Sequence, residues 1–459
     1  MATNGYSEAV AVAPERGMRF LLSCLMILIV VTDILDVPMS LGPGLSAKNA
    51  MLYLIALALA FKMIVQQRFV FELRALHVCF AILIAYSLVT VFAAAFIVQY
   101  PRYELIESGI NWKSRLVDQA IFFLVFFYGL HESRNAHWLI KVVLLAVIVG
   151  NAVAFLNAVG LISIGDMALR KDGRMTGVMG ESNQDAAFVA LFLPALAAAV
   201  LMGRGVGRIV WLVGLISSLG VIVLTASRGA YVGIVLAALW SMFIFRRYFP
   251  LRRIVAMAMG GAAVIGIFFA VMSVRYGDLL YKRLVGDTTS SDMVAASSGR
   301  LEIWSTALAA MADAPLSFIT GFGWNTYWSM PFRLSPHNHY LSLWFNVGLV
   351  GLICGILLLA LVVREAVKAV PVASVRDRPV LISFAIGTLA MSIATFFVDL
   401  YTPWLWFWAY AGLVMRIAVN ANPQWAQPVQ EAPAPVPAKR PEPVVRRDPF
   451  GWVGSQRAR

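Results

Sequence analysis

Residues 335–363 read SPHNHYLSLWFNVGLVGLICGILLLALVV, and this stretch decides the class of fold. Its apolar run is long enough to cross a hydrocarbon layer about 30 Å thick as a helix. Similar runs recur along the chain, of which 60% is hydrophobic and only 13% charged. A water-soluble protein of 459 residues would carry more charge on its surface. The sequence therefore predicts an all-α, polytopic membrane protein.

About twelve segments are expected to span the membrane. The first begins at Phe20, is too long for a signal-peptide core and has no small-residue cleavage site after it, so we expect it to be retained. The expected spans are residues 20–37, 49–66, 76–98, 116–130, 138–160, 185–202, 207–225, 229–246, 253–274, 338–363, 379–398 and 401–418. Twelve spans place both ends of the chain on one side of the membrane.

The basic residues of the short loops indicate the orientation, because cytoplasmic loops are enriched in Lys and Arg. Alternate loops carry the basic residues Arg68, Arg74, Arg134, Arg204, Arg208, Arg246, Arg247, Arg252, Arg253, Arg364, Lys368, Arg376 and Arg378. These loops share a side with both termini, which is therefore predicted to be cytoplasmic. The opposite side receives the loops 99–115 and 161–184 and a long segment, 275–336.

The chain is predicted to have three parts: a cytoplasmic N-terminus at 1–19, a transmembrane catalytic domain at 20–420 and a cytoplasmic tail at 421–459. The tail is rich in Pro and Ala and cannot bury a core, so we expect it to be disordered. The net charge of +13 reflects the basic loops and this tail. No nucleic-acid-binding motif accompanies the charge, and nucleic acid is not an expected partner.

Two polar stretches lie at the predicted outer ends of spans in the middle of the chain. RMTGVMGESNQDAAF begins at Arg174, and its Asn183 or Ser182 can cap the helix that follows. LTASRGAY places Arg228 between two apolar runs with almost no loop. Because an unpaired arginine in hydrocarbon is costly, Arg228 must reach lipid headgroups or face an aqueous pocket.

A third polar stretch, SSGRLEIW, contains Arg300. This residue opens an amphipathic segment with Leu301, Trp304 and Leu308 on one face, which is typical of a helix on a membrane surface. An Arg–Glu pair within the helix is the structural alternative. Together with Arg174 and Arg228, however, Arg300 favours an anionic ligand, because guanidinium groups fit phosphate oxygens and keep their charge.

The fourth polar stretch is the start of the opening segment. Pro336 breaks the chain there, so His337 and His339 occupy the loop before a helix and its first turn. The positive helix end disfavours protonation, and a neutral imidazole can accept a proton from a hydroxyl. A lone interfacial histidine more often bonds a headgroup or the backbone. Two histidines with Asn338 and Tyr340 in four positions favour a functional site.

Motifs for other chemistries are absent from the sequence. There is no zinc-type His/Cys spacing, no phosphate-binding P-loop, no GxSxG nucleophile motif and no D-x-D pair. We therefore expect neither a metal nor a cofactor. Arginines with a histidine suit a phosphate leaving group that is stabilised without a metal.

The pattern of His337, Asn338, nine residues, Gly348, two residues and Gly351 resembles the signature of the O-antigen ligase family of Gram-negative bacteria. LTASRGA is similar to the arginine-bearing segment of that family, and RMTGVMGESNQD to its Arg-x-x-Gly…Asn loop. In layout the resemblance covers about residues 20–418. The wider superfamily also contains O-antigen polymerases and protein O-oligosaccharyltransferases.

The resemblance implies a GT-C-like glycosyltransferase of the bacterial inner membrane. Such an enzyme transfers glycan from undecaprenyl diphosphate to lipid A–core on the periplasmic side, and we expect a metal-independent, inverting displacement. By position, His337 matches the histidine of the family, while Arg228 and Arg300 match its periplasmic arginines. We expect these arginines, with Arg174, to bind the diphosphate. His339 falls at a variable place of the pattern.

Three alternatives stay open at this point. An O-antigen polymerase or a protein O-oligosaccharyltransferase would use the same donor. The short tail and the lack of a predicted folded periplasmic domain after the spans favour the ligase over protein glycosylation. A flippase or transporter of lipid-linked glycans would carry ionisable groups near mid-membrane and on both sides, whereas the informative groups here lie on the predicted outer side.

Overall fold

The computed structural model describes residues 4–35, 37, 39–65, 72–158, 160–163, 174–248, 251–282, 286, 297, 299–333 and 335–422. Within these residues the chain is mostly helical, with one two-stranded antiparallel hairpin, β1 (Ser40–Gly42) and β2 (Leu45–Ser46). The longer helices are α1 (Asn4–Ile29), α2 (Ala47–Val65), α3 (Arg74–Phe92), α6 (Ser133–Ala158), α7 (Ser182–Met202), α8 (Gly205–Thr225), α9 (Arg228–Ile244), α10 (Leu251–Tyr281), α14 (His339–Ala369), α15 (Arg378–Ala394) and α16 (Thr402–Ala421). The shorter ones are η1 (Val30–Ile34), η2 (Ala93–Val98), α4 (Leu105–Trp112), η3 (Lys113–Val117), α5 (Asp118–Tyr128), α12 (Arg300–Asp313), α13 (Ser317–Thr320), η5 (Thr326–Trp328) and η6 (Thr395–Phe397).

Eight helical segments of the described chain are long and apolar enough to cross a membrane, which confirms a helical, multi-pass protein. They are Glu15–Ile34, Ala47–Val65, Arg74–Val98, Ser133–Ala158, Ser182–Met202, Gly205–Thr225, His339–Ala369 and Arg378–Phe397. Every one of the twelve expected spans coincides with a helix, but those at α5, α9, α10 and α16 do not meet this standard. With 11 and 17 residues, α5 and α9 are too short alone to cross about 30 Å at about 1.5 Å per residue.

The loop predicted at 99–115 is largely helical, and the prediction is wrong there. From Leu105 the helix runs through α4 and η3 directly into α5, with helical backbone angles at each junction. The charge of Lys113 suggested a loop. In the structure its Nζ lies 3.1 Å from Oδ2 of the buried Asp118, one turn further along the helix. The ion pair with Asp118 thus allows Lys113 to lie within the helix.

The predicted termini are only partly described. The chain from residue 423 on lies outside the described residues, so the disordered tail stays a prediction, and α1 already begins at Asn4 within the expected N-terminal segment. The middle of the 161–184 loop and much of 283–296 also lie outside the described residues. All three cysteines are free, and Cys79 Sγ lies 3.4 Å from the Cys354 carbonyl oxygen, as packing residues do.

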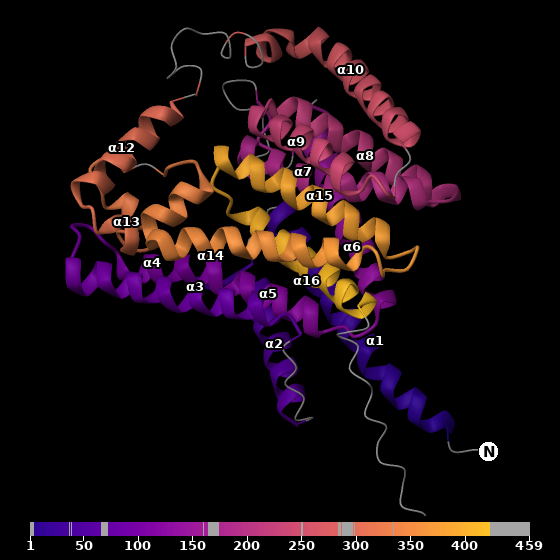
Figure 1. The fold of residues 1–459 in the computed structure, drawn as a ribbon, viewed down its shortest axis with the longest axis horizontal. Coiled ribbons are helices and arrows are strands. Elements are labelled where there is room, and N and C mark those ends of the chain that lie inside the picture. The colour runs from indigo at the N-terminus through magenta and orange to yellow at the C-terminus, as the bar shows by residue number, and fades with distance from the viewer. Residues whose placement is uncertain are drawn as a thin grey trace, which may run out of the picture.

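Helix α15 lies in the middle of the bundle, with α7, α8 and α9 on one side and α14 and α16 on the other (Figure 1). Close approach is possible because Gly387 of α15 has no side chain. A Cβ there would lie 1.9 Å from the carbonyl oxygen of Leu191 on α7. Small residues let membrane helices approach closely in this way, and the packing energy replaces the hydrophobic drive that lipid does not supply.

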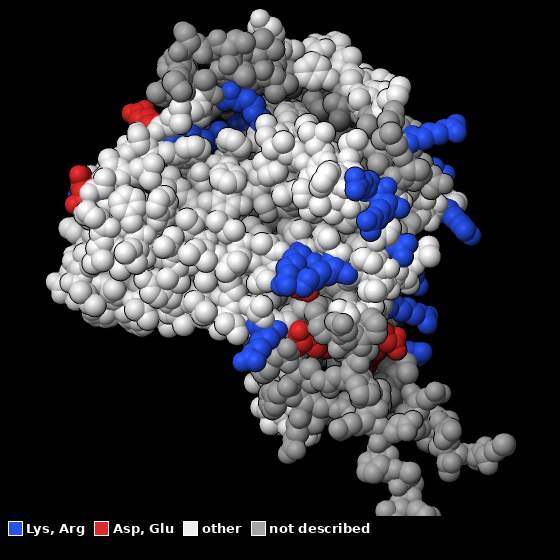
Figure 2. Space-filling model, viewed as in Figure 1, with Lys and Arg blue, Asp and Glu red and all other residues white. Residues whose placement is uncertain are grey.

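The bundle has two chemically different ends. One end carries the start of α14 and the turn between α15 and α16, and we call it the His337 end. The opposite end carries the turn between α14 and α15, and Lys and Arg gather toward it on the right of Figure 2. We call it the basic end. Its exposed cations include Arg204, Arg208, Arg246, Arg247, Arg364, Lys368 and Arg376. The alternate-loop pattern of the sequence thus gathers its cations at one end.

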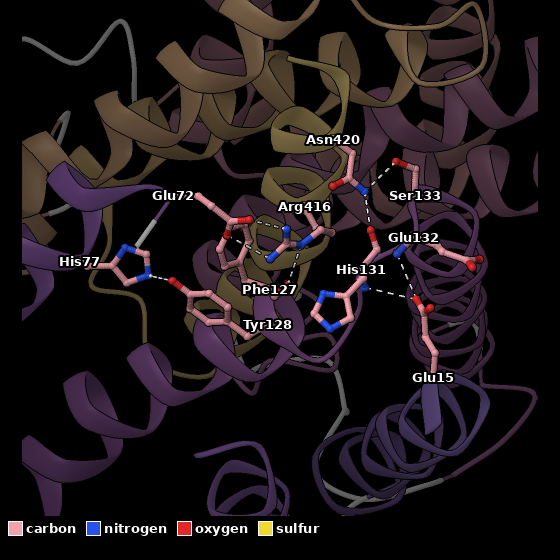
Figure 3. A network of polar contacts seen from close by, with 10 residues as sticks. All are labelled: Glu15, Glu72, His77, Phe127, Tyr128, His131, Glu132, Ser133, Arg416 and Asn420. Carbon is pink, nitrogen blue, oxygen red and sulfur yellow. Dashed lines mark hydrogen bonds and ion pairs between the residues drawn. The ribbon is translucent and has the colours of Figure 1, made fainter. Parts of the chain in front are cut away.

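A polar network closes the bundle at the basic end (Figure 3). Arg416 of α16 donates from Nη1 and Nη2 to the two carboxylate oxygens of Glu72 at 3.0 and 3.2 Å, and from Nε to the Phe127 carbonyl at 3.0 Å. Its guanidinium also lies over the Phe127 ring. Asn420 donates to the carbonyl of His131 at 2.7 Å. These bonds explain how a buried arginine is tolerated inside α16.

Candidate functional site

The turn between α15 and α16 connects the predicted site residues. On one side of it, the amide of Tyr401 donates to Oε1 of Gln184 in the first turn of α7 at 3.0 Å. The start of α9 packs beside it, since a Cβ at Gly229 would lie 2.6 Å from the ring of Phe397. The starts of α7 and α9 are therefore held at this turn.

On the other side, the same turn holds the histidine loop. Oγ of Ser335 donates to Oδ2 of Asp399, which is buried in the turn. The hydroxyl of Tyr340 donates to the carbonyl oxygen of Ser392 at the end of α15 at 2.8 Å. The predicted site residues thus form two groups that meet at one turn, although they are far apart in the sequence.

The first group joins the loop of Arg174 to the turn that carries Arg228. Arg174 donates from Nε to the Thr225 carbonyl at 2.8 Å and from Nη2 to Oδ1 of Asn183 at 2.9 Å. Ser227 donates to the same Asn183 oxygen at 3.1 Å. Since Arg174 is only 6% exposed, its visible bonds are structural ones that hold the two loops together.

The predicted cap of the following helix is wrong. Neither Asn183 nor Ser182 caps α7. The Glu181 side chain does so by accepting a hydrogen bond from the amide of Gln184 at 2.8 Å. Asn183 instead donates to Glu181 at 2.8 Å while it accepts from Arg174. Glu181 and Asn183 could each cap the helix, and the contact with Arg174 engages Asn183 elsewhere. This contact joins two segments, so the positions in the sequence do not reveal it.

Arg228 is the first residue of α9 and is half-buried at the His337 end. The preceding residue, Ser227, makes no side-chain cap bond to α9. Its hydroxyl is directed to Asn183 instead. The guanidinium of Arg228 therefore lies at the positively polarised start of a helix, and both features favour an anion.

The second group is built around the start of α14. Asn338 caps this helix, because its Oδ1 accepts from the amides of Tyr340 and Leu341 at 3.0 and 3.1 Å. His339 is the first helical residue, as predicted. The exposed His337 precedes the cap with a φ of +49°, a left-handed conformation that costs a non-glycine residue about 1–2 kcal/mol. Such strain is typically found at functional positions.

Arg300 opens α12, which packs against the histidine loop. Nε1 of Trp304 donates to the carbonyl oxygen of Pro336 at 2.8 Å, next to His337. Trp304 therefore faces inward with Ala307 and Met311, whereas the predicted partners of its face, Leu301 and Leu308, remain exposed. The helix itself is confirmed, and its position on a membrane surface stays a prediction.

A break in α14 creates a cavity next to these residues. Gly348 has a φ of +66°, and a Cβ there would lie 2.1 Å from the carbonyl oxygen of Ile319. The break turns the first limb of α14 back onto the second, so that a Cβ at Gly355 would lie 2.4 Å from the Leu343 side chain. Residues of both limbs line a cavity, among them His339.

The cavity wall also contains two residues that sequence reasoning did not select, Arg115 and Asp399. The Arg115 guanidinium lies 3.7 Å from the centroid of the Tyr401 ring and 3.4 Å from the Tyr327 hydroxyl. Burial raises the pKa of Asp399, although the bond from Ser335 and the nearby Arg115 guanidinium act in the opposite direction.

Both residues left a weak signal in the sequence. Arg115 is one of several cations on the predicted outer side, and Asp399 is an acid between two apolar runs. Only the fold shows that they share one cavity. Within the described residues, no group of three or more His, Cys, Asp or Glu side chains is arranged to hold a metal ion.

The geometry can be compared with known proteins. A search of curated proteins found no match to the chain. Residues 213–356 match the family model described as O-antigen ligase, and this segment contains Arg228, Arg300, His337 and the helix break at Gly348. Over residues 213–356, about a third of its length, the chain is therefore similar to the O-antigen ligase family.

Proposed function

We propose that the chain is an O-antigen ligase of the bacterial inner membrane that works on its periplasmic face. It would transfer glycan from undecaprenyl diphosphate to lipid A–core during lipopolysaccharide assembly. The observation that carries this proposal is a set of contacts at one end of the bundle: the start of α9 packs on Phe397, Ser335 bonds to Asp399, and Trp304 of α12 bonds to Pro336. Arg228, Arg300 and His337 belong to these segments and lie within the part of the chain that matches the family. The apolar helices support a site at a membrane surface, where two lipid-linked substrates can meet.

The donor is bound through its diphosphate in this proposal. Arg228 and Arg300 contact the phosphate oxygens with paired N–H groups, which a guanidinium presents in a fixed plane. Their charges do not titrate near neutral pH and stabilise the negative charge that develops on the leaving diphosphate. Arg174 supports them from behind, because its bonds to Thr225 and Asn183 hold the turn that carries Arg228.

The acceptor hydroxyl is activated by His337. Its neutral imidazole accepts the hydroxyl proton while the acceptor oxygen attacks the anomeric carbon of the glycan. The bond from that carbon to the diphosphate oxygen breaks, and undecaprenyl diphosphate leaves with the electron pair. A single displacement of this kind inverts the anomeric configuration. His339, Asn338 and Tyr340 shape the site, Asn338 by capping the helix that fixes the loop of His337.

We also propose that the reaction needs no divalent metal. Metal ions at phosphoryl and glycosyl transfer sites neutralise the departing phosphate. Two fixed guanidinium groups can perform this task, and at a periplasmic site they cannot be lost by dissociation. This proposal rests on the chemistry of Arg228 and Arg300.

Purified protein with both lipid substrates tests the function. We expect glycan transfer from polyprenyl diphosphate to lipid A–core in the absence of ATP, measured as a mass increase of the acceptor. A parallel reaction with donor alone detects polymerase activity as elongation of the lipid-linked glycan, and a third with a serine-containing peptide detects protein glycosylation. Product in either of these reactions, and none with lipid A–core, would contradict the ligase assignment.

A further inference from the structure

A second cavity lies at the basic end, across the bundle from His337. It lies among α6, α7, α8, α15 and α16. The small side chains of Ala195, Ala198 and Ala199 and the residue Gly203 create space along α7, which also contains Pro194. Nothing in the proposed transfer reaction uses this cavity.

The charged residues of the wall are all basic or histidine. Lys141 and Arg376 line the cavity, are exposed, and have no ion pair or hydrogen bond with any described residue. His137 also lines it, with Nε2 2.5 Å from Oδ1 of Asp377. That carboxylate stands outside the lining and additionally accepts a bond from Ser374. The wall therefore presents two cations that form no ion pair with a described residue, and the carboxylate of Asp377 lies near enough to Arg376 to interact with its charge.

The inner part of the cavity is apolar with a buried polar end. Leu144 and Trp211 contribute apolar surface, and Met202, which is 45% exposed, marks the opening. The hydroxyl of Tyr410 is buried at this end, beside Ser383. The cavity thus combines an exposed cationic rim with an apolar interior that ends at two buried hydroxyl groups.

We propose that this cavity binds an anionic phospholipid. Its phosphate contacts Lys141 and Arg376, and one acyl chain lies against Leu144, Trp211 and the alanines of α7. A free phosphate would contact only the cations of the rim and leave the apolar wall exposed to water. A phospholipid would contact the cations with its phosphate and cover the apolar wall with an acyl chain. Basic pockets between membrane helices on the cytoplasmic side suit phosphate headgroups, and the predicted orientation places the basic end there.

The proposed lipid would stabilise the helices that carry the His337 end. Helices α7, α15 and α16 line the cavity, and their opposite ends carry Gln184, Asp399 and Tyr401. An ordered lipid between these helices would restrict their relative motion. This inference is independent of the transfer reaction, because it concerns binding and can be measured without donor or acceptor.

Native mass spectrometry of the full chain tests the proposal. The parent, the double variant Lys141→Gln with Arg376→Gln, and the control Arg246→Gln with Arg247→Gln are each delipidated and exposed to phosphatidylglycerol in mixed micelles. The control removes two exposed cations of the same end that do not line the cavity. We expect the parent and the control to retain one phosphatidylglycerol. The affinity of the double variant for this lipid should be at least about tenfold lower.

Two further arms distinguish the ligand and the packing. Excess inorganic phosphate should not displace phosphatidylglycerol from the parent, and Ala198→Phe, which fills the apolar part, should weaken retention with both cations present. Equal binding by the parent and the double variant would overturn the proposal. Displacement by inorganic phosphate, or the same loss in the control, would also overturn it, because a soluble anion or general surface charge would then be sufficient.

Discussion

The two ends of the bundle use arginine in opposite ways. At the basic end, Arg416 is 4% exposed and has both Nη atoms bonded to Glu72 and Nε bonded to Phe127. At the His337 end, Arg228 and Arg300 each begin a helix and are only half-buried. The comparison contrasts one arginine, which the protein encloses and bonds to its own acceptors, with two half-buried arginines at helix starts, to which the proposal assigns an anionic ligand.

The largest expected effect on activity comes from His337→Ala. Loss of a general base typically reduces a rate by about 10²–10⁴-fold, and the exposed His337 contributes little packing. We expect the melting temperature to stay close to that of the parent, while the initial rate of transfer falls by at least about 100-fold. His131→Ala is the matched control, because it removes an exposed histidine at the basic end. Near-parental transfer by His337→Ala would remove this residue from the mechanism.

Glu72→Gln should act on stability instead. Removing one partner of a buried ion pair leaves the other charge uncompensated, which costs about 3–5 kcal/mol in the free energy of unfolding. Unfolding in denaturant measures this loss, and transfer per folded molecule should not change. Glu132→Gln, at an exposed position of the same end, is the control. A variant as stable as the parent would show that the pair with Arg416 is not what holds α16.

Arginine-to-lysine changes at the His337 end should give an intermediate effect on activity. Arg228→Lys and Arg300→Lys keep the charge and lose the planar fork, so we expect about 10–100-fold slower transfer with an unchanged melting temperature. Arg246→Lys at the basic end should have no effect. If both lysine variants transfer glycan at the parental rate, a positive charge alone is sufficient and the bidentate contact is not needed.

The smallest expected effect is the pH dependence that Asp399 contributes. Burial raises its pKa in the folded protein above the ordinary value of 3.8. Its contribution to stability is therefore fully present below 3.8 and is lost as the pH rises through the folded pKa. The expected difference is about 1.4 kcal/mol for each unit by which the pKa is raised.

Unfolding of Asp399→Asn and the parent across this pH range measures the contribution. The amide cannot ionise, so the stability of the variant should fall less as the pH rises. Parallel curves would mean that Asp399 titrates alike in the folded and unfolded chains.

The sequence predicted those features that are local. Each expected span coincides with a helix because an apolar run of this length is a property of one segment. The start of α14 at His339 followed from Pro336 and the polar residues before it. The same locality explains why Arg228 was correctly placed between two helices with almost no loop.

The features that were missed depend on contacts between distant segments. The break at Gly348 is fixed by the 319–323 segment, where the amides of Phe322 and Gly323 donate to the carbonyls of Phe345 and Asn346 at 2.8 and 2.9 Å. An apolar run that contains glycines gives no sign of such a partner. The joint position of Arg115 and Asp399 likewise exists only in the folded chain, since 284 residues of sequence separate them.

The most direct test of the account is transfer by the purified protein in excess EDTA. In the proposal, Arg228 and Arg300 stabilise the negative charge of the departing diphosphate, and His337 accepts the proton of the acceptor hydroxyl. It predicts that glycosylated lipid A–core and free undecaprenyl diphosphate form in equal amounts with chelator present, at the rate seen without it. Transfer that stops in EDTA and returns with magnesium or manganese would contradict the account, because a metal ion would then carry the charge assigned to the arginines.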